Sequence, residues 1–444
     1  MSHARPISRR LLGLATTAAL SAGLFGTGTA VAQTPPGPVA ALNSGARPLG
    51  DLTALDRMVG GARVVGLGEA GHSAHEFFTL KQRVFRHLVT GKGFTTFALE
   101  ASWSTGLRLD AYATRGVGDP ERIMRDEFQG QYRFWNTEEY LDLIHWMRAY
   151  NVAHPGRPRL RFVGNDLGFP GKEAFDQVTD YTAAYRPDLT AAIESSYREL
   201  RPAAGTQAGD WMLTQLTGKG PDQLESEADT ATAALTLLRE QGRPRGADRR
   251  SREAYAWAVQ SATAITQSFT GYAYPQSRFP ERMRYRDQAM AANTVWWLRN
   301  RGGKILLASN NGHIAYVSDN PAEFPEPTGA FLRRRLGDDY VNIGLTFNQG
   351  SMNAFPDFTA DRPRTYPVAP APAGHNEHTL DRVRHRDFVI DLRTAPPAAR
   401  TWLAAARPTR SYGLYWSPED PHIALGRSYD ILIHLHEVQA AHLR

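Results

Sequence analysis

A strand, a tight loop, a helix and a second strand follow one another between residues 62 and 100, and this unit constrains the fold more than any other feature. The strands are expected over residues 62–67 and 94–99, and the helix over residues 73–90. Two strands joined by a crossover helix form the repeating unit of a parallel sheet whose faces are covered by helices. The unit therefore predicts an α/β fold.

The ends of this helix carry their own signals. Ser73 and Glu76 form an S-x-x-E pattern, which predicts a capping box at the first turn. Gly91 and Gly93 are expected to end the helix near Thr90, because glycine readily adopts the left-handed conformation that terminates helices. The turn between strand and helix is therefore confined to the short loop that separates them.

The rest of the chain extends this pattern. Further strands are expected at residues 160–163, 304–308, 340–347, 388–392 and 430–434, and a Pro/Ala-rich loop at 363–374. Residues 176–301 follow a helical pattern without a convincing strand. We therefore predict a mostly parallel sheet flanked by helices, built from residues 49–175 and 302–444, with an inserted all-helical lobe and an active-site cleft between them.

Residues 1–32 have the pattern of a signal peptide. Arg9 and Arg10 precede an apolar run, which ends in the small-residue site Ala30-Val-Ala32. Paired arginines are typical of twin-arginine signals, and an ordinary secretory signal is the alternative. The run is short and interrupted, so we expect a secreted, extracytoplasmic protein without a stable membrane anchor. Residues 33–48, rich in Pro, Ala and Gly, are expected to form a flexible leader.

The amino-acid composition limits the kinds of site and binding partner that the chain can have. The 444 residues include no cysteine, which excludes disulfides, thiolate metal sites and a cysteine nucleophile. Three arginines of the signal supply half of the formal net charge of +6, and no basic run interleaved with aromatics follows. Nucleic acid is therefore not an expected partner. We expect a monomer that binds a small molecule.

Polar residues follow several of the expected strands at their carboxyl ends. They are Glu69, His72, Glu100, Asp166, Asn310 and His313. In a parallel sheet these strand ends share one edge, where ligand sites form. Because charged groups are rarely buried without partners, their convergence predicts a functional site rather than a core.

His72 is the candidate general base, because the pKa of an ordinary imidazole lies near working pH. Glu69, three residues earlier, would fix its tautomer and raise its basicity. For His72 taken alone, a hydrogen-bonded structural role is the alternative. Lys81 lies on or beside the apolar face of the helix, and we interpret it as a lysine that extends along this face to solvent, with pairing to Glu100 as the alternative.

The sequence was also compared with the patterns of three other kinds of site. The glycines at 66, 68 and 71 match the dinucleotide-binding pattern G-x-G-x-x-G, but Glu69 would place a carboxylate where a pyrophosphate must lie. No G-x-S-x-G elbow occurs, so a hydrolase built here is expected to activate water directly. No H-E-x-x-H occurs either, and a zinc or manganese centre made of the two histidines and two glutamates is the alternative.

Taken together, these residues resemble the erythromycin esterase family. The most specific combination is Gly68-Glu-Ala-Gly-His72 with Glu100 downstream and Asn310-Asn-Gly-His313 later in the chain. The matching segments occur in family order at residues 64–81, 93–100, 146–151, 162–166, 286–293, 310–314 and 337–344.

The resemblance implies attack of water on an ester carbonyl, which opens a macrolide lactone in the best-known members, without a metal or other cofactor. It implies His72 as the general base, Glu69 and Glu100 as carboxylates that orient the base and the water, and His313 as the group that positions or polarises the carbonyl. Lys81 joins this catalytic set. Residues Asn310, Asp166 and Arg286 are expected to bind substrate.

Two positions depart from the family pattern. Asn310 stands where the family often has histidine, and Lys81 stands where the best-known esterases have arginine. Arginine can hold a carboxylate by two parallel hydrogen bonds, which lysine cannot do. We therefore predict an exported carboxylic ester hydrolase, with macrolide hydrolysis and antibiotic resistance as the narrower expectation. A metal-dependent hydrolase and a non-catalytic exported small-molecule-binding protein are the alternatives.

Overall fold

A mixed, mostly parallel sheet of nine strands organises the described part of the chain. The computed structural model describes residues 37–444 except 245, 247, 358–359, 361 and 417–419, so the predicted signal peptide at 1–32 lies outside it. The strands follow the order β1-β8-β11-β6-β2-β5-β3-β4, with β7 paired to β6 and β9 paired to β10 in a separate ribbon. Their bounds are β1 (Arg47–Pro48), β2 (Val64–Leu67), β3 (Phe94–Ser102), β4 (Arg161–Asp166), β5 (Lys304–Ala308), β6 (Tyr340–Ala354), β7 (Arg364–Val368), β8 (Phe388–Asp391), β9 (Arg407–Pro408), β10 (His422–Ile423) and β11 (Ile431–Val438).

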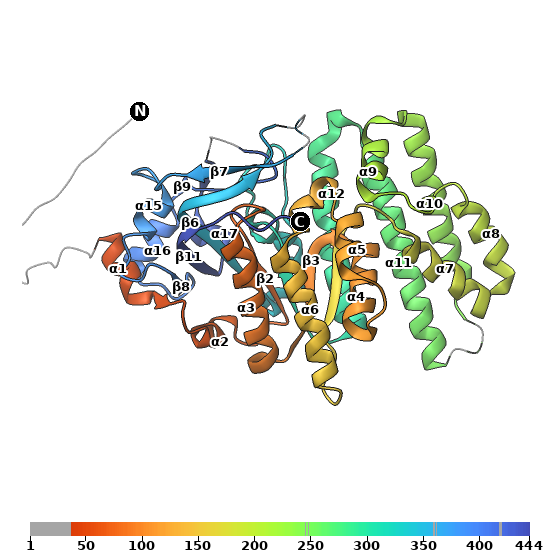
Figure 1. Ribbon diagram of the computed structural model, residues 1–444, viewed down its shortest axis with the longest axis horizontal. Coiled ribbons are helices and arrows are strands. Elements are labelled where there is room, and N and C mark those ends of the chain that lie inside the picture. Colours follow the sequence, from red (N-terminus) through yellow and green to blue (C-terminus); the bar gives the residue numbers. More distant parts are fainter. Residues whose placement is uncertain (1–36, 245, 247, 358–359, 361, 417–419) are drawn as a thin grey trace, which may run out of the picture. The chain divides into compact units, whose positions relative to one another are not determined.

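Parallel pairing connects β4, β3, β5, β2, β6 and β11, whereas β1, β7 and β8 pair antiparallel with their neighbours. This arrangement confirms the predicted α/β fold with a mostly parallel sheet (Figure 1). Every strand expected from the sequence is present. The strands β3, β4, β6 and β11 continue beyond the predicted ends, whereas β2 and β8 are slightly shorter than predicted.

Helices cover both faces of the sheet (Figure 1). Their bounds are α1 (Pro38–Gly45), α2 (Thr53–Val59), α3 (His75–Lys92), α4 (Trp103–Arg115), α5 (Pro120–Glu127), η1 (Gly130–Trp135), α6 (Glu138–Ala153), α7 (Lys172–Tyr185), α8 (Pro187–Tyr197), α9 (Ala208–Thr217), α10 (Pro221–Gln241), α11 (Arg249–Ala273), η2 (Gln276–Arg278), α12 (Phe279–Arg301), α13 (Asn311–Ile314), α14 (Thr328–Leu336), η3 (Gly337–Asp339), α15 (Asn376–Leu380), α16 (Pro397–Leu403) and α17 (Leu425–Ser428). Between β4 and β5 the described residues form helices and turns but no strand, in agreement with the helical pattern of residues 176–301. None of the described helices has the length and apolarity needed to cross a membrane.

The central strands are buried on both sides because successive side chains enter different cores. In β5, Leu306 and Ala308 pack into the core that contains α3 and α6, whereas Ile305 and Leu307 pack into the core that contains α12 and α14. This alternation follows from the two-residue period of a strand. It explains why the strand sequences are continuous apolar runs, as expected of parallel strands covered on both faces.

Part of the expected flexible leader is ordered, which corrects the prediction for residues 33–48. Pro38 occupies the first turn of α1, where a proline ring favours helix, and Leu42 is fully buried. Pro48 and Arg47 form β1, which pairs with β8. A leader of this composition folds here because its few apolar side chains find a buried place beside the sheet, which the pattern of Pro, Ala and Gly does not reveal.

The capping box predicted at the start of α3 is also wrong. The helix begins at His75 after Ala74, without a side-chain cap. The Ser73 hydroxyl instead accepts a hydrogen bond from the Asn353 amide at 3.0 Å, and Glu76 accepts from the backbone N–H of Gln439 at 2.6 Å. Both side chains thus form tertiary hydrogen bonds instead of capping the helix. The predicted helix end is confirmed, because Gly93 caps α3 with φ of 72° in the left-handed region.

The register of the parallel strands brings the predicted site together. Leu67 of β2 pairs with Ala308 of β5, and Ala308 pairs with Leu99 of β3. The residues that follow these three positions therefore emerge at one level of the same sheet edge. The loop after β2 lies tightly against α13, since a Cβ on Gly68 would lie only 2.1 Å from Asn311 Oδ1. This close approach accounts for a glycine of the G-x-G-x-x-G pattern without a bound nucleotide.

Candidate active site

Glu69 is the carboxylate around which the first half of the site is built. It is fully buried, its Oε1 lies 2.9 Å from Nδ1 of His72, and its Oε2 accepts a hydrogen bond from Nζ of Lys81. Lys81 is fully buried as well, and its Nζ donates to the Ser309 carbonyl at 3.3 Å. Burial lowers the pKa of Lys81, although the charge of Glu69 opposes that shift.

The prediction for Lys81 is therefore wrong in both of its forms. Its side chain does not extend to solvent, and its hydrogen-bonded carboxylate is Glu69 rather than Glu100. The loop after β2 and the end of β5 cover this turn of α3, so the ammonium group can reach only the buried oxygens that they provide. A buried lysine needs such partners because an uncompensated charge in the interior is very costly.

Glu100 is the centre of the second half of the site. Its Oε2 accepts hydrogen bonds from the Ser309 hydroxyl at 2.7 Å and the Asn310 backbone N–H at 3.2 Å, while Oε1 accepts from the Arg286 guanidinium at 2.7 Å. Burial by itself would raise the pKa of Glu100. The positive charges of His313 and Arg286 outweigh that effect and hold the pKa well below its usual range.

Arg286, on α12, ties the ends of two strands together. Its guanidinium binds both carboxylate oxygens of Asp166, with Nε 3.0 Å from Oδ2 and 3.1 Å from Oδ1, in addition to its hydrogen bond with Glu100. Burial raises the pKa of Asp166 although Arg286 opposes the shift. Two carboxylates on β3 and β4 thus converge on one guanidinium from the helical segment.

His313, on the short helix α13, lies against the same guanidinium. Its Nδ1 is 2.7 Å from Oδ1 of Asp287, which also accepts from the backbone N–H of Thr328 at 2.7 Å. Its Nε2 is 3.4 Å from Oε1 of Glu100. Burial would lower the pKa of His313, but the charges of Asp287 and Glu100 raise it to about 10. These carboxylates therefore favour the imidazolium form of His313, which can stabilise negative charge.

His72 lies between an aromatic ring and a carboxylate. Its ring packs edge-on against Trp135 with 5.0 Å between centroids, and Trp135 Nε1 donates to the Glu100 carbonyl at 2.7 Å. Glu69 engages Nδ1, whereas Nε2 has no hydrogen-bond partner among the described residues. The His72 side chain is 10% exposed.

All of the predicted site residues lie in these two connected halves. Glu69 and Lys81 are fully buried beneath the site. The side chains of His72, Arg286 and His313 are about a tenth exposed. The eight predicted residues are His72, Glu69, Glu100, His313, Lys81, Asn310, Asp166 and Arg286, and their roles remain predictions. The structure shows Asn310 capping α13 through Gly312 N–H at 2.8 Å, which gives it a local structural role as well.

Three members of this network were not predicted from the sequence. Asp287 orients His313, Ser309 connects Glu100 with Lys81, and Trp135 packs on His72. Asp287 directly follows Arg286 in one of the segments that carry the family resemblance, so this adjacency was the available signal. No comparable signal marks Trp135, which reaches the site through the chain that crosses from α5 to α6.

A cavity of about 730 Å³ lies between the sheet edge at β4 and the helical segment. Its lining is rich in charged side chains, including Arg108, Asp110, Arg161 and Asp180, and it contains none of the eight predicted site residues. This cavity is therefore not the active-site cleft expected between the two parts of the fold, because the catalytic candidates lie elsewhere. The two histidines lie at the carboxyl ends of the central strands, with side chains about a tenth exposed.

The fold and the site define an α/β protein with a histidine–carboxylate site at the carboxyl edge of a mostly parallel sheet. More specifically, the chain belongs to the erythromycin esterase family, because the family model for erythromycin esterase matches residues 89–438. The match confirms the family to which the sequence motifs pointed.

Individual relatives are distant. An erythromycin esterase type II from Escherichia coli is 24% identical over 317 residues, which cover 68% of this chain and 72% of that protein. A crystal structure described as a succinoglycan biosynthesis protein is 29% identical with a TM-score of 0.79, covering 92% of this chain and 98% of the other. A mutant of an erythromycin esterase in its open conformation is 19% identical with a TM-score of 0.68 over 87% of this chain and 94% of the other, a likeness of fold.

Proposed function

We propose that this protein hydrolyses carboxylic esters, with His72 as the general base that activates water. One observation carries the proposal: Glu69 engages Nδ1 of His72 at 2.9 Å, and Nε2 is left without a partner among the described residues. A carboxylate on Nδ1 fixes the tautomer in which Nε2 carries a lone pair and stabilises the imidazolium that forms when Nε2 takes a proton. Lys81 holds the second oxygen of Glu69, so the carboxylate cannot rotate away.

The reaction consumes one water. Nε2 of His72 accepts a proton as the water oxygen bonds to the ester carbonyl carbon, and the carbonyl oxygen becomes an oxyanion. The carbon–oxygen bond to the leaving alcohol then breaks as the carbonyl re-forms, and His72 returns the proton to the departing oxygen. The products are a carboxylic acid and an alcohol, and His72 ends the cycle neutral.

His313 and Arg286 are suited to stabilise the oxyanion. Both are positive and partly exposed, and both are held in place by buried carboxylates. Preorganised donors of this kind are typically worth about 10²- to 10³-fold in kcat each. Glu100 positions both cations through its Oε1. The cluster thus offers a base on one side and a positive site on the other.

Electrostatics favours this scheme over a metal centre made of the same residues. Glu69 and Glu100, which a metal would need as ligands, are already bound by Lys81 and Arg286. A divalent ion would have to approach the cations of Lys81 and Arg286 and compete with them for the carboxylate oxygens. Repulsion between like charges in a buried site makes this costly.

The substrate is proposed only as a class. The E. coli relative is named an erythromycin esterase, and the structure of higher identity is named for succinoglycan biosynthesis, so relatives of this fold carry different functional names. We propose an ester or lactone of a small molecule, with macrolides as one arm of the test. A protein that only binds such a molecule is the competing proposal, and it differs in predicting no turnover.

The experiment compares wild type, His72→Ala and His422→Ala on macrolides and simple aryl and alkyl esters, with and without a chelator. His422 is an exposed histidine on β10 and serves as the matched control. We expect ester turnover in wild type and His422→Ala, a loss of about 10²- to 10⁴-fold in His72→Ala, and no effect of the chelator on the chemical step. Unchanged activity in His72→Ala would overturn the proposed base, and binding without turnover by wild type would favour the binding protein.

A further inference from the structure

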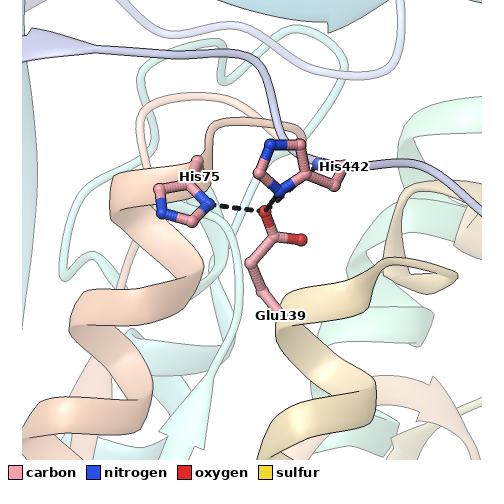
Figure 2. A group of neighbouring side chains, drawn as sticks. All are labelled: His75, Glu139 and His442. Carbon is pink, nitrogen blue, oxygen red and sulfur yellow. Dashed lines mark hydrogen bonds and ion pairs between the residues drawn. The ribbon is translucent and has the colours of Figure 1, made fainter.

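Outside the catalytic site, two histidines and a glutamate converge where three distant parts of the chain meet (Figure 2). His75 is the first residue of α3, Glu139 belongs to the first turn of α6, and His442 lies in the C-terminal segment after β11. Among the described residues, these three side chains have the spacing that a metal ion would need. We propose that it binds a divalent transition metal ion, Zn²⁺ in particular.

The geometry supports this assignment. Nδ1 of His75 lies 2.7 Å and Nδ1 of His442 lies 3.2 Å from the same oxygen of Glu139, and the ligand atoms all lie within 4.8 Å of one another. Around a tetrahedral zinc ion with bonds of about 2.0–2.1 Å, ligand atoms are about 3.3 Å apart. Small rotations of the three side chains therefore make room for the ion at their centre. Figure 2 shows both rings directed at the carboxylate.

The charge of Glu139 also favours a bound cation. Its side chain is only 3% exposed, its Oε2 is buried without a hydrogen-bond partner, and within the described residues no lysine or arginine pairs with it. A buried carboxylate needs a compensating charge. A divalent cation at this position would balance the carboxylate and engage its free oxygen.

The ligand types select the ion. Two imidazole nitrogens and one carboxylate oxygen favour zinc and its neighbours in the transition series over Mg²⁺ or Ca²⁺, which prefer oxygen ligands. His75 is 34% and His442 is 61% exposed, so water can complete the coordination. The site is therefore open to solvent and to exchange of its ion.

An ion here would join the C-terminal segment to the catalytic loop. His75 lies three residues after His72, and its backbone N–H donates to the Gln439 carbonyl at 2.7 Å. Glu139 lies four residues after Trp135, the ring that packs on His72. Metal binding would thus strengthen the contact between the tail and the two segments that hold the base, and we expect it to raise the thermal stability of the protein.

The test is a titration of metal-free full-length protein with Zn²⁺ by calorimetry and with Co²⁺ by absorption, which reports tetrahedral coordination. We expect one equivalent to bind, with a rise in Tm that excess chelator reverses. His442→Ala removes an exposed ligand with little risk to the fold and should weaken binding by at least about 100-fold, the upper end of what loss of an outer-shell partner costs. His75→Ala should act in the same way.

Two variants place the site. His422→Ala, the exposed control, and His72→Ala, which alters the catalytic cluster, should both bind Zn²⁺ with wild-type affinity. Absence of saturable binding by wild type, or equal binding by His442→Ala, would overturn the proposal and leave a hydrogen-bonded cluster only. Loss of binding in His72→Ala with binding retained in His442→Ala would overturn it too, because the ion would then belong to the catalytic cluster. These readouts do not depend on ester turnover.

Discussion

Nζ of Lys81 donates a hydrogen bond to Oε2 of Glu69, and both side chains are completely buried. The pair connects the first turns of α3 with the loop after β2. The other carboxylate oxygen of Glu69, Oε1, engages His72. A buried ion pair of this kind contributes little net stability compared with a well-packed apolar pair, but removal of one partner leaves an uncompensated charge. The pair therefore couples folding to the position of the base.

Removal of the positive partner should destabilise the protein strongly. Lys81→Met leaves Glu69 buried without its ammonium partner, and we expect a loss of about 3–5 kcal/mol in the free energy of unfolding. The double variant Glu69→Gln/Lys81→Met is neutral at both positions and should recover most of this loss. Denaturant unfolding of the wild type, both single variants and the double variant measures the coupling energy between Glu69 and Lys81. A double variant whose loss in unfolding free energy equals the sum of the two single losses would contradict the prediction.

The same double variant separates stability from catalysis. With Gln at position 69, the group at Nδ1 of His72 no longer carries the charge that stabilises the imidazolium. We expect the folded double variant to lose about 10²- to 10⁴-fold in kcat on any ester that the wild type hydrolyses, with KM changed little. Restored stability together with wild-type kcat would show that Glu69 serves the fold alone.

The fold was predictable from the sequence where strands are continuous apolar runs. Four strands were not predicted. The two-residue strand β10 is one of them, and the other three, β1, β7 and β9, each contain a proline, namely Pro48, Pro367 and Pro408. Proline cannot donate to a ladder, so such segments occur at sheet edges and have the composition of loops. The Pro/Ala-rich loop expected at 363–374 thus contains an edge strand, which no local pattern distinguishes from an extended loop.

The site was predictable as far as register determines it. Residues at the carboxyl ends of parallel strands converge for any chain of this fold, and Glu69, Glu100 and His313 follow that rule. The environment of Lys81 did not follow from its helix face, because the groups that bury it come from a loop and from a strand more than 200 residues later. The role of Asp287 depends in the same way on α12 meeting α13.

Export is a proposal that rests on residues 1–32, outside the described part of the chain. Arg9→Lys with Arg10→Lys keeps the charge of the segment, so an ordinary secretory signal would still function, whereas a twin-arginine signal would not. We expect the variant precursor to stay inside the producing cell and the wild type to appear outside it, cleaved after Ala32. Fractionation and N-terminal sequencing of the product check both parts, and export of the double-lysine variant would favour the ordinary secretory route.

The charge of His313 should make stability depend on pH in a defined window. Its pKa of about 10 in the folded protein lies above the usual 6.5 of an unfolded histidine, so folded His313 binds its proton more tightly. The contribution of His313 to the free energy of unfolding is therefore complete below about pH 6.5 and is lost as pH rises toward 10. The difference in unfolding free energy between wild type and His313→Gln should narrow across this range. Asp287→Asn removes the nearest charge and should move the window to lower pH. Unfolding experiments at a series of pH values measure the difference, and a constant difference from pH 6 to 10 would show that His313 is neutral in the folded protein.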